Sequence, residues 1–118
     1  MRFQRKTYWI GLWSEYWVAF ILRLRGYRIL AHRFQSPAGE IDLVVAKPGL
    51  LVLVEVKARS GLDQGLMALR SSQKKRLLRA APFACVAFPA WSGRTVRFDL
   101  AIQRPWRFPF FIKNFDLH

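Results

Sequence analysis

The middle of the chain consists of two apolar runs in which the polar residues recur with a period of two. The runs span Ile41–Ala46 and Leu50–Val56, and the turn signal Lys47-Pro48-Gly49 separates them. β-Branched runs on either side of a Pro-Gly turn are typical of a β-hairpin. We therefore expect two adjacent antiparallel strands, with the side chains of each strand alternating between the two faces of the sheet.

The charged residues of this hairpin are spaced so that they meet across the strands. With the Pro-Gly pair at the centre of the turn, Asp42 is opposite Glu55 and Glu40 is opposite Lys57. Opposed Cβ atoms on one face lie about 4.5–5.5 Å apart, and carboxylates that close repel each other unless a cation lies between them. Lys57 supplies one positive charge, and carboxylate oxygens are also the ligands that Mg²⁺ and Mn²⁺ prefer. The spacing leaves two interpretations open: a cation site, or a solvated face with ordinary cross-strand ion pairs.

The segments around the hairpin predict further helices and strands, and together they indicate an α/β domain with a mixed sheet. In chain order we expect a helix over Tyr8–Leu24 ended by Gly26, a strand over Tyr27–Phe34, a turn over Ser36–Gly39, the hairpin, a loop over Ala58–Arg70, a helix capped by Ser71 or Ser72, and a strand over Arg94–Ile102. Pro82 removes a hydrogen bond from the second helix and is expected to end or kink it. The aromatic and basic tail, Arg104–His118, either packs on the sheet or stacks on bases.

The first helix is apolar on nearly all sides, so each of its two faces needs a packing partner. Trp9, Trp13 and Trp17 share one stripe. We expect these tryptophans to be buried, in the core or in a homodimer contact, and a membrane-surface contact is the third interpretation. The apolar run of this helix is too short to span a bilayer, so no transmembrane segment is expected.

Glu15 lies on the other side of this helix, between two small residues. Gly11 and Ala19 are four positions before and after it, so a neighbouring strand can approach closely there. Glu15 then either reaches over the sheet toward the hairpin acids or has a structural role.

The length of the chain indicates the number of domains, and its net charge indicates the kind of partner. A chain of 118 residues fits one domain, residues 1–118, and 20 Lys and Arg against 7 Asp and Glu give a net charge of +13. Such a charge attracts polyanions, so nucleic acid is the expected partner, although binding to ribosomes or anionic membranes would explain it as well. Most of the few acids cluster in or near the hairpin: Glu15, Glu40, Asp42 and Glu55.

Three further residues have side chains that could take part in chemistry, but we expect each of them to have a structural role. Cys85 is the only cysteine, which excludes an intrachain disulfide and indicates the cytoplasm, and its apolar neighbours favour a place in the core. His32 stands alone in a strand, and Asp99 lies in an apolar strand where a salt bridge is expected. We therefore place the chemistry at the hairpin.

The amino-acid sequence of the hairpin resembles that of a known family. Asp42, then twelve residues, then Glu55-Val56-Lys57 resembles the D…(D/E)-x-K signature of the restriction-endonuclease-like nuclease superfamily. More narrowly, G-E-I-D and V-E-V-K-A-R are similar to the YraN-like family of small bacterial proteins. The resemblance extends over most of the chain, through Gly11, Glu15, Arg25-Gly26-Tyr27, Lys74 and Arg97-Phe98-Asp99. It departs at Ile41, where the superfamily often has proline, and at Pro82, which interrupts a helix expected to be longer.

This resemblance implies a fold, a reaction and a set of roles. The fold is a restriction-endonuclease-like core, in which three antiparallel strands and a later strand form a mixed sheet flanked by helices. The reaction is Mg²⁺- or Mn²⁺-dependent hydrolysis of phosphodiester bonds in DNA, including branched or otherwise structured DNA. Asp42, Glu55 and the carbonyl of Val56 would hold the metal, and Lys57 would act on the attacking water or on the phosphate.

The remaining implied roles are accessory. Glu40 and Glu15 would be further ligands of the site. The residues expected to grip the nucleic-acid backbone are Arg59, Lys74, Lys75, Arg76 and Arg79. If the carboxylates repel in the absence of metal, replacing Asp42 or Glu55 by alanine should leave the stability unchanged or raise it. The alternative function is an inactive basic module on the same fold that binds nucleic acid or assists assembly.

Overall fold

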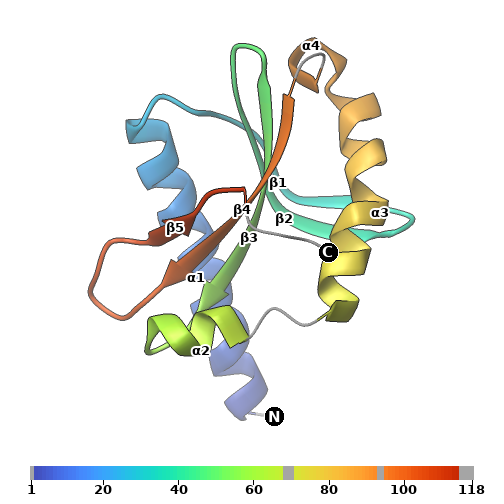
Figure 1. Cartoon of the computed structure of the whole chain (residues 1–118). Coiled ribbons are helices and arrows are strands. Elements are labelled where there is room, and N and C mark those ends of the chain that lie inside the picture. Colours follow the sequence, from blue (N-terminus) through green and yellow to red (C-terminus); the bar gives the residue numbers. More distant parts are fainter. Residues whose placement is uncertain (1, 68–70, 93–94, 115–118) are drawn as a thin grey trace.

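The protein is a mixed five-stranded sheet with helices on both faces (Figure 1). The computed structural model describes residues 2–67, 71–92 and 95–114. In chain order the elements are α1 (Arg2–Leu24), β1 (Arg28–Ser36), β2 (Gly39–Lys47), β3 (Leu50–Ala58), α2 (Leu62–Met67), α3 (Ser71–Ala87), α4 (Pro89–Ser92), β4 (Thr95–Gln103) and β5 (Phe110–Ile112). The strands follow one another across the sheet, antiparallel except for the parallel pair β3 and β4. The predicted α/β class with a mixed sheet is confirmed, and the arrangement is compatible with a restriction-endonuclease-like core.

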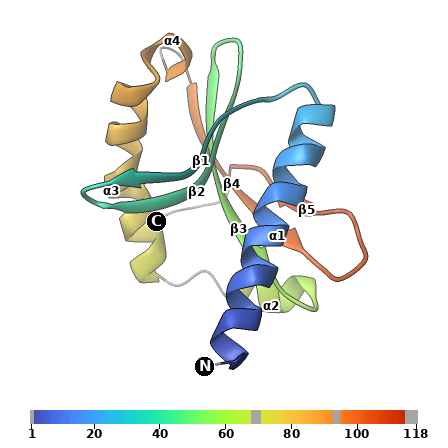
Figure 2. The ribbon, with the colours of Figure 1, turned by 180° about the vertical axis from the view of Figure 1, so that it is seen from behind.

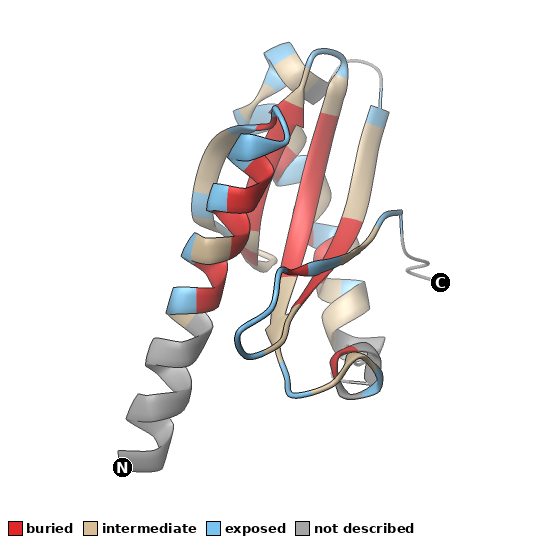
Figure 3. Cartoon of the chain, turned by 90° about the vertical axis from the view of Figure 1, so that its left-hand side faces the viewer, coloured by how far each residue is buried: buried red, intermediate tan, exposed pale blue. Residues whose placement is uncertain are grey.

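Helices α1 and α3 lie on opposite faces of the sheet, as the two views in Figures 1 and 2 show. On the α1 face, Val18 and Leu22 pack against the β2 and β3 side chains Leu43, Val45, Val52 and Val54. On the α3 face, Leu77, Ala80 and Ala84 pack against Ile41, Val44, Leu51 and Leu53. The hairpin strands are therefore apolar on both sides, and Figure 3 shows them buried along much of their length.

The β2–β3 hairpin has the predicted register. Its pairs run from Lys47 and Leu50, beside the turn, to Leu43 and Val54. The turn residue Gly49 has a φ of +75°, a conformation that glycine adopts without strain. The ladder ends one pair short of Asp42, so β2 and β3 separate where the acidic residues begin.

Strand β2 changes face at the same place. Ile41 packs on the α3 side, whereas Leu43, two residues later, packs on the α1 side. Strict alternation would put both on one face. The neighbouring strand is irregular as well, since Arg33 has a φ of +51° and the register of β1 shifts between Ile29 and Ala31. Asp42 thus sits at a local twist of the sheet.

The second half differs from the expectations at three points. Helix α3 continues through Pro82 to Ala87, because a proline removes only one backbone donor and the inner face of the helix stays packed on the sheet on both sides of it. The segment predicted as a loop contains α2, in which a Cβ at Gly65 would lie 2.5 Å from Ile102, so only glycine allows this close approach. Part of the tail forms β5 and pairs with β4, which confirms packing on the sheet for that part and adds a strand that the sequence did not predict.

The tryptophan stripe is not a core element. Trp13 is 72% exposed, so its predicted burial in the core is wrong for the single chain. Trp17 is half-buried and stacks on Phe20 and on Phe108 of the β4–β5 connection. The side chains of Trp9 and Gly11 lie outside the described residues. Burial of Trp13 in a contact between two copies stays a prediction.

The salt bridge predicted for Asp99 is confirmed. Arg97 donates hydrogen bonds of 2.9 Å to both carboxylate oxygens of Asp99 and one of 2.8 Å to the Tyr27 hydroxyl. His32 is exposed beside the Tyr16 ring, and Cys85 packs half-buried against the α3-side core. None of the described helices is both long and apolar enough to cross a bilayer.

Candidate active site

The acidic site forms where β2 and β3 separate. Beyond the last backbone pair, the Oδ2 atom of Asp42 accepts a hydrogen bond of 2.8 Å from the backbone N–H of Val56. The side chain of Asp42 thus lies between the two strands and satisfies a donor that β2 no longer pairs. This fixes the Asp42 carboxylate beside the end of β3, where Glu55 lies.

Glu55 is the most buried acid of this group, with 2% of its surface exposed. Its Oε1 atom is 3.4 Å from Nζ of Lys57 and 3.9 Å from an Nη atom of Arg76. Its Oε2 atom is buried and accepts no hydrogen bond from an N–H or O–H donor of the described residues, and it can bond to the neighbouring Asp42 carboxylate only through a shared proton. One oxygen of Glu55 is therefore shared by two cations, while the other has none, which is a costly state for a buried carboxylate.

Burial and mutual repulsion shift the protonation of both acids. The pKa of Glu55 is raised to about 8, above all by burial and then by the neighbouring Asp42 carboxylate. The cations of Lys57 and Arg76 lower the pKa of Glu55, without cancelling the rise. Burial likewise raises the pKa of Asp42, against the opposing effect of the Val56 N–H. Without a further cation, the pair therefore retains a proton near neutral pH.

Arg76 reaches this site from α3 by crossing the start of β2. A Cβ at Gly39 would lie 2.4 Å from Cδ of Arg76, and Gly39 has a φ of +133°. Only glycine accommodates both the backbone conformation and the overlying side chain. The Nε atom of Arg76 is buried and has no hydrogen-bond partner among the described residues. This N–H is therefore available to donate to a bound ligand.

Glu15 and Glu40 border the site but are engaged elsewhere. Arg33 donates to both oxygens of Glu15, at 3.2 and 3.0 Å, and lies 3.9 Å from Glu40. Gln35 donates to Glu40 at 2.8 Å. Burial raises the pKa of Glu15, the hydrogen bonds from Arg33 lower it, and the charge of Asp42 raises it again. Glu15 is therefore close enough to sense Asp42, although its direct partner is Arg33.

The predicted site residues thus fall into an inner and an outer set. Asp42, Glu55, Val56 and Lys57 come together, and Arg76 joins them rather than serving only as a surface cation. The other residues expected to contact the DNA backbone lie apart from this inner set: Arg59 donates to the carbonyl of Ala58, Lys74 is half-buried, and Lys75 and Arg79 are exposed on α3.

Sequence reasoning missed two features of this site, Arg33 and the position of Arg76. Nothing in the spacing of Arg33 marks it as the partner of Glu15, because the two residues are brought together only by the packing of α1 on β1. For Arg76, the one available signal is Gly39, which opens the G-E-I-D segment and leaves room for a long side chain.

The donor set at the separated strands fits a divalent cation. Within residues 2–67, 71–92 and 95–114, no three His, Cys, Asp or Glu side chains are grouped so that they could hold a metal by themselves. Asp42 and Glu55 nevertheless provide carboxylate oxygens, one of which accepts no hydrogen bond from a described N–H. The raised pKa values of both acids indicate that the site lacks positive charge, which a bound cation would supply. Oxygen donors of this kind suit Mg²⁺ and Mn²⁺, which complete their coordination with backbone carbonyls and water.

Comparison with known proteins places the chain in a family. A family model described as "Uncharacterised protein family UPF0102" matches residues 14–102. The chain belongs to the UPF0102 family. Among the similar UPF0102 proteins, one from Bartonella bacilliformis is 39% identical over 112 residues, covering 95% of this chain and 92% of the relative. Another from Chelativorans is 39% identical over 111 residues, and one from Parvibaculum lavamentivorans is 43% identical over 103 residues, with 94% and 87% of this chain and 90% and 77% of the relatives covered.

The UPF0102 match confirms the YraN-like resemblance that the hairpin residues carried. It includes all four acids of the site region and the helix that supplies Arg76. The names of these relatives give the family and no activity. The chemistry of the site must therefore be argued from its geometry.

Proposed function

We propose that this protein is a divalent-cation-dependent nuclease that hydrolyses phosphodiester bonds in DNA, including branched or otherwise structured DNA. One observation carries the proposal: a buried Glu55 oxygen lies beside the Asp42 carboxylate and accepts no hydrogen bond from a described N–H, and the cations of Lys57 and Arg76 converge on the same acid. This combination of carboxylates and cations is suited to holding a metal ion and a phosphate side by side.

Each inner residue has a role in this reaction. Asp42, Glu55 and the carbonyl of Val56 would hold Mg²⁺ or Mn²⁺, which when bound lowers the pKa of a water and offsets charge on the phosphate. The ammonium of Lys57, 3.4 Å from Glu55, is held where it can donate to the attacking water or to the phosphate. The unpartnered Nε–H of Arg76 would donate to a phosphate oxygen, which gives this buried donor an acceptor.

The outer residues position the site and the substrate. The Arg33 pair holds Glu15 at the edge of the acids, and Glu40 adds negative charge that raises the pKa of Asp42, which strengthens the attraction for a cation. Arg59, Lys74, Lys75 and Arg79 would contact the DNA backbone, which gives affinity without sequence preference. We propose the cytoplasm as the place of action, in keeping with a single cysteine.

The alternative is a nucleic-acid-binding or assembly module on the same fold. It is favoured by the ion pairs that the protein's own side chains form: Lys57 and Arg76 approach Glu55, and Arg33 engages Glu15. In that case the acids would form a buried polar network of structural value only.

A cleavage assay with a matched set of variants separates the two functions. Labelled junction, flap, nicked, linear and RNA substrates are incubated with Mg²⁺ or Mn²⁺ and wild-type, Glu55→Gln, Asp42→Asn or Asp63→Asn protein. Asp63 is an exposed acid of α2 and serves as the control for loss of one negative charge. We expect wild type and Asp63→Asn to cleave DNA and to give heat on Mn²⁺ titration, and the two site variants to lose both.

Two results would contradict the proposal. Cleavage that persists in Glu55→Gln protein purified free of host nucleases would show that Glu55 holds no catalytic metal. Binding of nucleic acid by wild-type protein without cleavage in either metal, and without Mn²⁺ heat, would favour the inactive module.

A further inference from the structure

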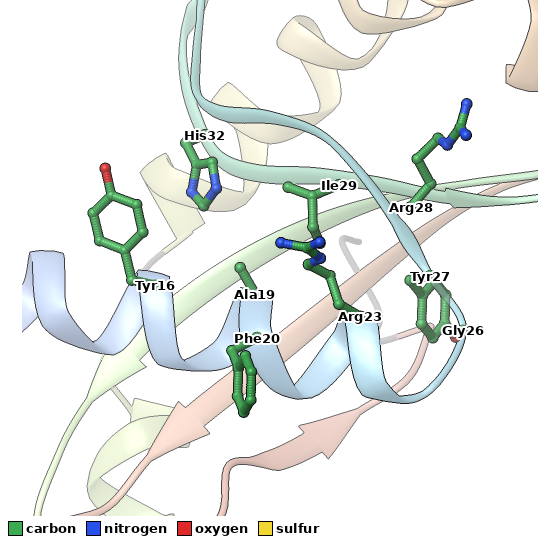
Figure 4. Close-up of a pocket in the computed structure, with 9 residues that line it drawn as sticks. All are labelled: Tyr16, Ala19, Phe20, Arg23, Gly26, Tyr27, Arg28, Ile29 and His32. Carbon is green, nitrogen blue, oxygen red and sulfur yellow. The ribbon is translucent and has the colours of Figure 1, made fainter.

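A groove between α1 and the edge strand β1 is not used by the proposed chemistry. It has a volume of about 690 Å³ and is open to solvent along the second half of α1 (Figure 4). Side chains that face it are Tyr16 and His32 at one end, Ala19 and Ile29 along the floor, and Arg23 above Ile29. Its size falls within the roughly 300–1,000 Å³ typical of small-ligand pockets.

The chemistry of the groove favours a flat, anionic ligand. The rings of Tyr16 and His32 have centroids 4.9 Å apart and form an aromatic end wall. Burial lowers the pKa of His32, so this ring is uncharged at neutral pH. Arg23 supplies an exposed cation, and no Asp or Glu is among the described residues that line the groove. An aromatic platform beside a guanidinium is suited to a base and its phosphate.

The groove adjoins the acidic site through neighbours in sequence. Glu15 precedes Tyr16 on α1, and Arg33 follows His32 on β1. These two neighbours form the 3.0 Å ion pair at the edge of the acids, and Glu15 senses the charge of Asp42. The Tyr16–His32 wall therefore lies next to the α1 side of the acidic site.

The other cationic surface lies across the sheet. Helix α3, with Lys74, Lys75 and Arg79, covers the face opposite α1 (Figures 1 and 2). The acids lie where β2 and β3 separate. On α3 these three cations share the helix with one partly exposed ring, Phe83, and the cations suit the backbone of a duplex. The α1 groove has two neighbouring aromatic rings, and only a base that is not stacked in a duplex can stack on them.

We propose that the α1–β1 groove binds an unpaired nucleotide of the substrate, with the base on the Tyr16–His32 wall and the phosphate at Arg23. The inference rests on the proposed function for its substrate class, and it specifies a substrate with a single-stranded segment next to the scissile bond. Arg28 has no part in it, because its guanidinium lies over the Trp91 ring and points away from the groove.

Binding measurements on matched double variants test this assignment. Fluorescence anisotropy with Ca²⁺ in place of Mg²⁺ compares a short oligothymidine with a blunt duplex at one fixed salt concentration. The groove variant is Tyr16→Ala/Arg23→Ala, and the control is Trp106→Ala/Arg107→Ala, which removes one exposed ring and one exposed arginine from the β4–β5 connection. We expect the groove variant to weaken oligothymidine binding roughly tenfold, as loss of one stacking contact does, and duplex binding less than threefold. The control should weaken both ligands alike.

Direct contact and rescue sharpen the test. An oligothymidine that carries 5-iodouracil should crosslink to a peptide containing Tyr16 or His32, and Tyr16→Phe should restore the affinity that Tyr16→Leu loses, since only the ring is needed. Parallel losses on oligothymidine and duplex, or crosslinks confined to other peptides, would overturn the assignment. So would a groove variant with unchanged binding but altered sedimentation, because a second copy of the chain would then be the occupant.

The outcome separates this inference from the proposed function. Wild-type protein that binds oligothymidine through the groove but cleaves nothing would refute the nuclease and leave the groove assigned. Wild-type protein that cleaves DNA, with an unchanged preference for single-stranded segments in the groove variant, would refute the groove alone. Thermal melts of both variants verify that they are folded.

Discussion

The Oδ2 atom of Asp42 accepts a 2.8 Å hydrogen bond from the backbone N–H of Val56, immediately beyond the last backbone pair of the β2–β3 ladder. The side chain thus takes the place of the main-chain acceptor that β2 would have offered had the ladder continued. Asp42 therefore has a structural role besides the metal-binding role proposed for it, and the two roles are separable by substitution.

Asp42→Ala should be less stable than Asp42→Asn when both are measured without divalent cations. Asparagine retains an oxygen acceptor for the Val56 N–H, whereas alanine leaves this partly buried donor unpaired, at a cost of roughly 1–3 kcal/mol. The structure therefore reverses the expectation that removing the carboxylate would only relieve repulsion. Urea unfolding of the two variants measures the difference, and equal stabilities would show that the hydrogen bond contributes nothing.

The stability of the metal-free protein should fall as the pH rises through the range set by Glu55. The folded pKa of about 8 lies above the ordinary value of 4.5, so the folded state holds its proton more tightly than the unfolded chain. The resulting stabilisation is complete below pH 4.5 and is lost by about pH 8. It amounts to a few kcal/mol at most, since one pKa unit corresponds to about 1.4 kcal/mol.

Glu55→Gln is the control for this pH dependence. It has no proton to lose, so its denaturant midpoint should decline much less between pH 5 and 8, and above pH 8 it should be the more stable protein. Saturating Mn²⁺ should remove most of the wild-type decline, because a bound cation replaces the proton. A wild-type curve parallel to that of Glu55→Gln would mean that Glu55 titrates normally.

Gly39 and Arg76 should be energetically coupled. Gly39→Ala places a Cβ within 2.4 Å of Cδ of Arg76 and imposes a φ of +133° on a residue with a side chain, so the variant should lose more than about 1 kcal/mol. Truncation in Arg76→Ala removes the clash but not the backbone strain. The double variant should therefore be more stable than the sum of the single effects predicts, as a double-mutant cycle from urea unfolding would reveal. Strict additivity would indicate that Arg76 does not lie over Gly39.

The exposed apolar residues of α1 and of the β4–β5 connection predict self-association. Trp13, Leu24 and Phe108 are each about 70% exposed, at 72%, 69% and 69%, and Phe20 is 50% exposed. Together they offer roughly 500 Å² of apolar surface, against about 800 Å² per partner in a standard interface. In sedimentation velocity at high salt, which screens the net charge, the wild-type weight-average mass should rise with concentration. That of Trp13→Ser/Phe108→Ser should not, and identical behaviour of the two proteins would exclude this face as the contact.

The sequence was sufficient for the hairpin because local rules determine it. The Pro-Gly turn and the alternation of apolar residues set the register, and the pairs from Lys47–Leu50 to Leu43–Val54 confirm it. Extrapolation of the same rule would make Asp42 and Glu55 a backbone pair, and there it fails. The end of the ladder depends on the irregularity of β1 and on the change of face at Asp42, which arise from packing between elements.

The remainder of the site depends on contacts between residues far apart in the chain. The pair of Glu15 and Arg33 spans 18 positions, and the contact of Arg76 with Glu55 requires α3 to fold back over the sheet. Neither pair has a periodic signal in the sequence. Local rules also overstated the effect of Pro82, since tertiary packing along the inner face of α3 outweighs one missing hydrogen bond.

The parallel pairing of β3 and β4 has a consequence for the order of assembly during folding. Strands β1, β2 and β3 are joined by tight turns, whereas β4 reaches β3 only after a long crossover that contains α2, α3 and α4. Contacts between close neighbours in sequence form sooner than contacts that close long loops. The two repelling acids belong to the early meander, and Arg76 arrives with the late crossover. Millimolar Mg²⁺ should consequently accelerate refolding as well as slow unfolding, because it would neutralise the acids before the protein's own guanidinium reaches them.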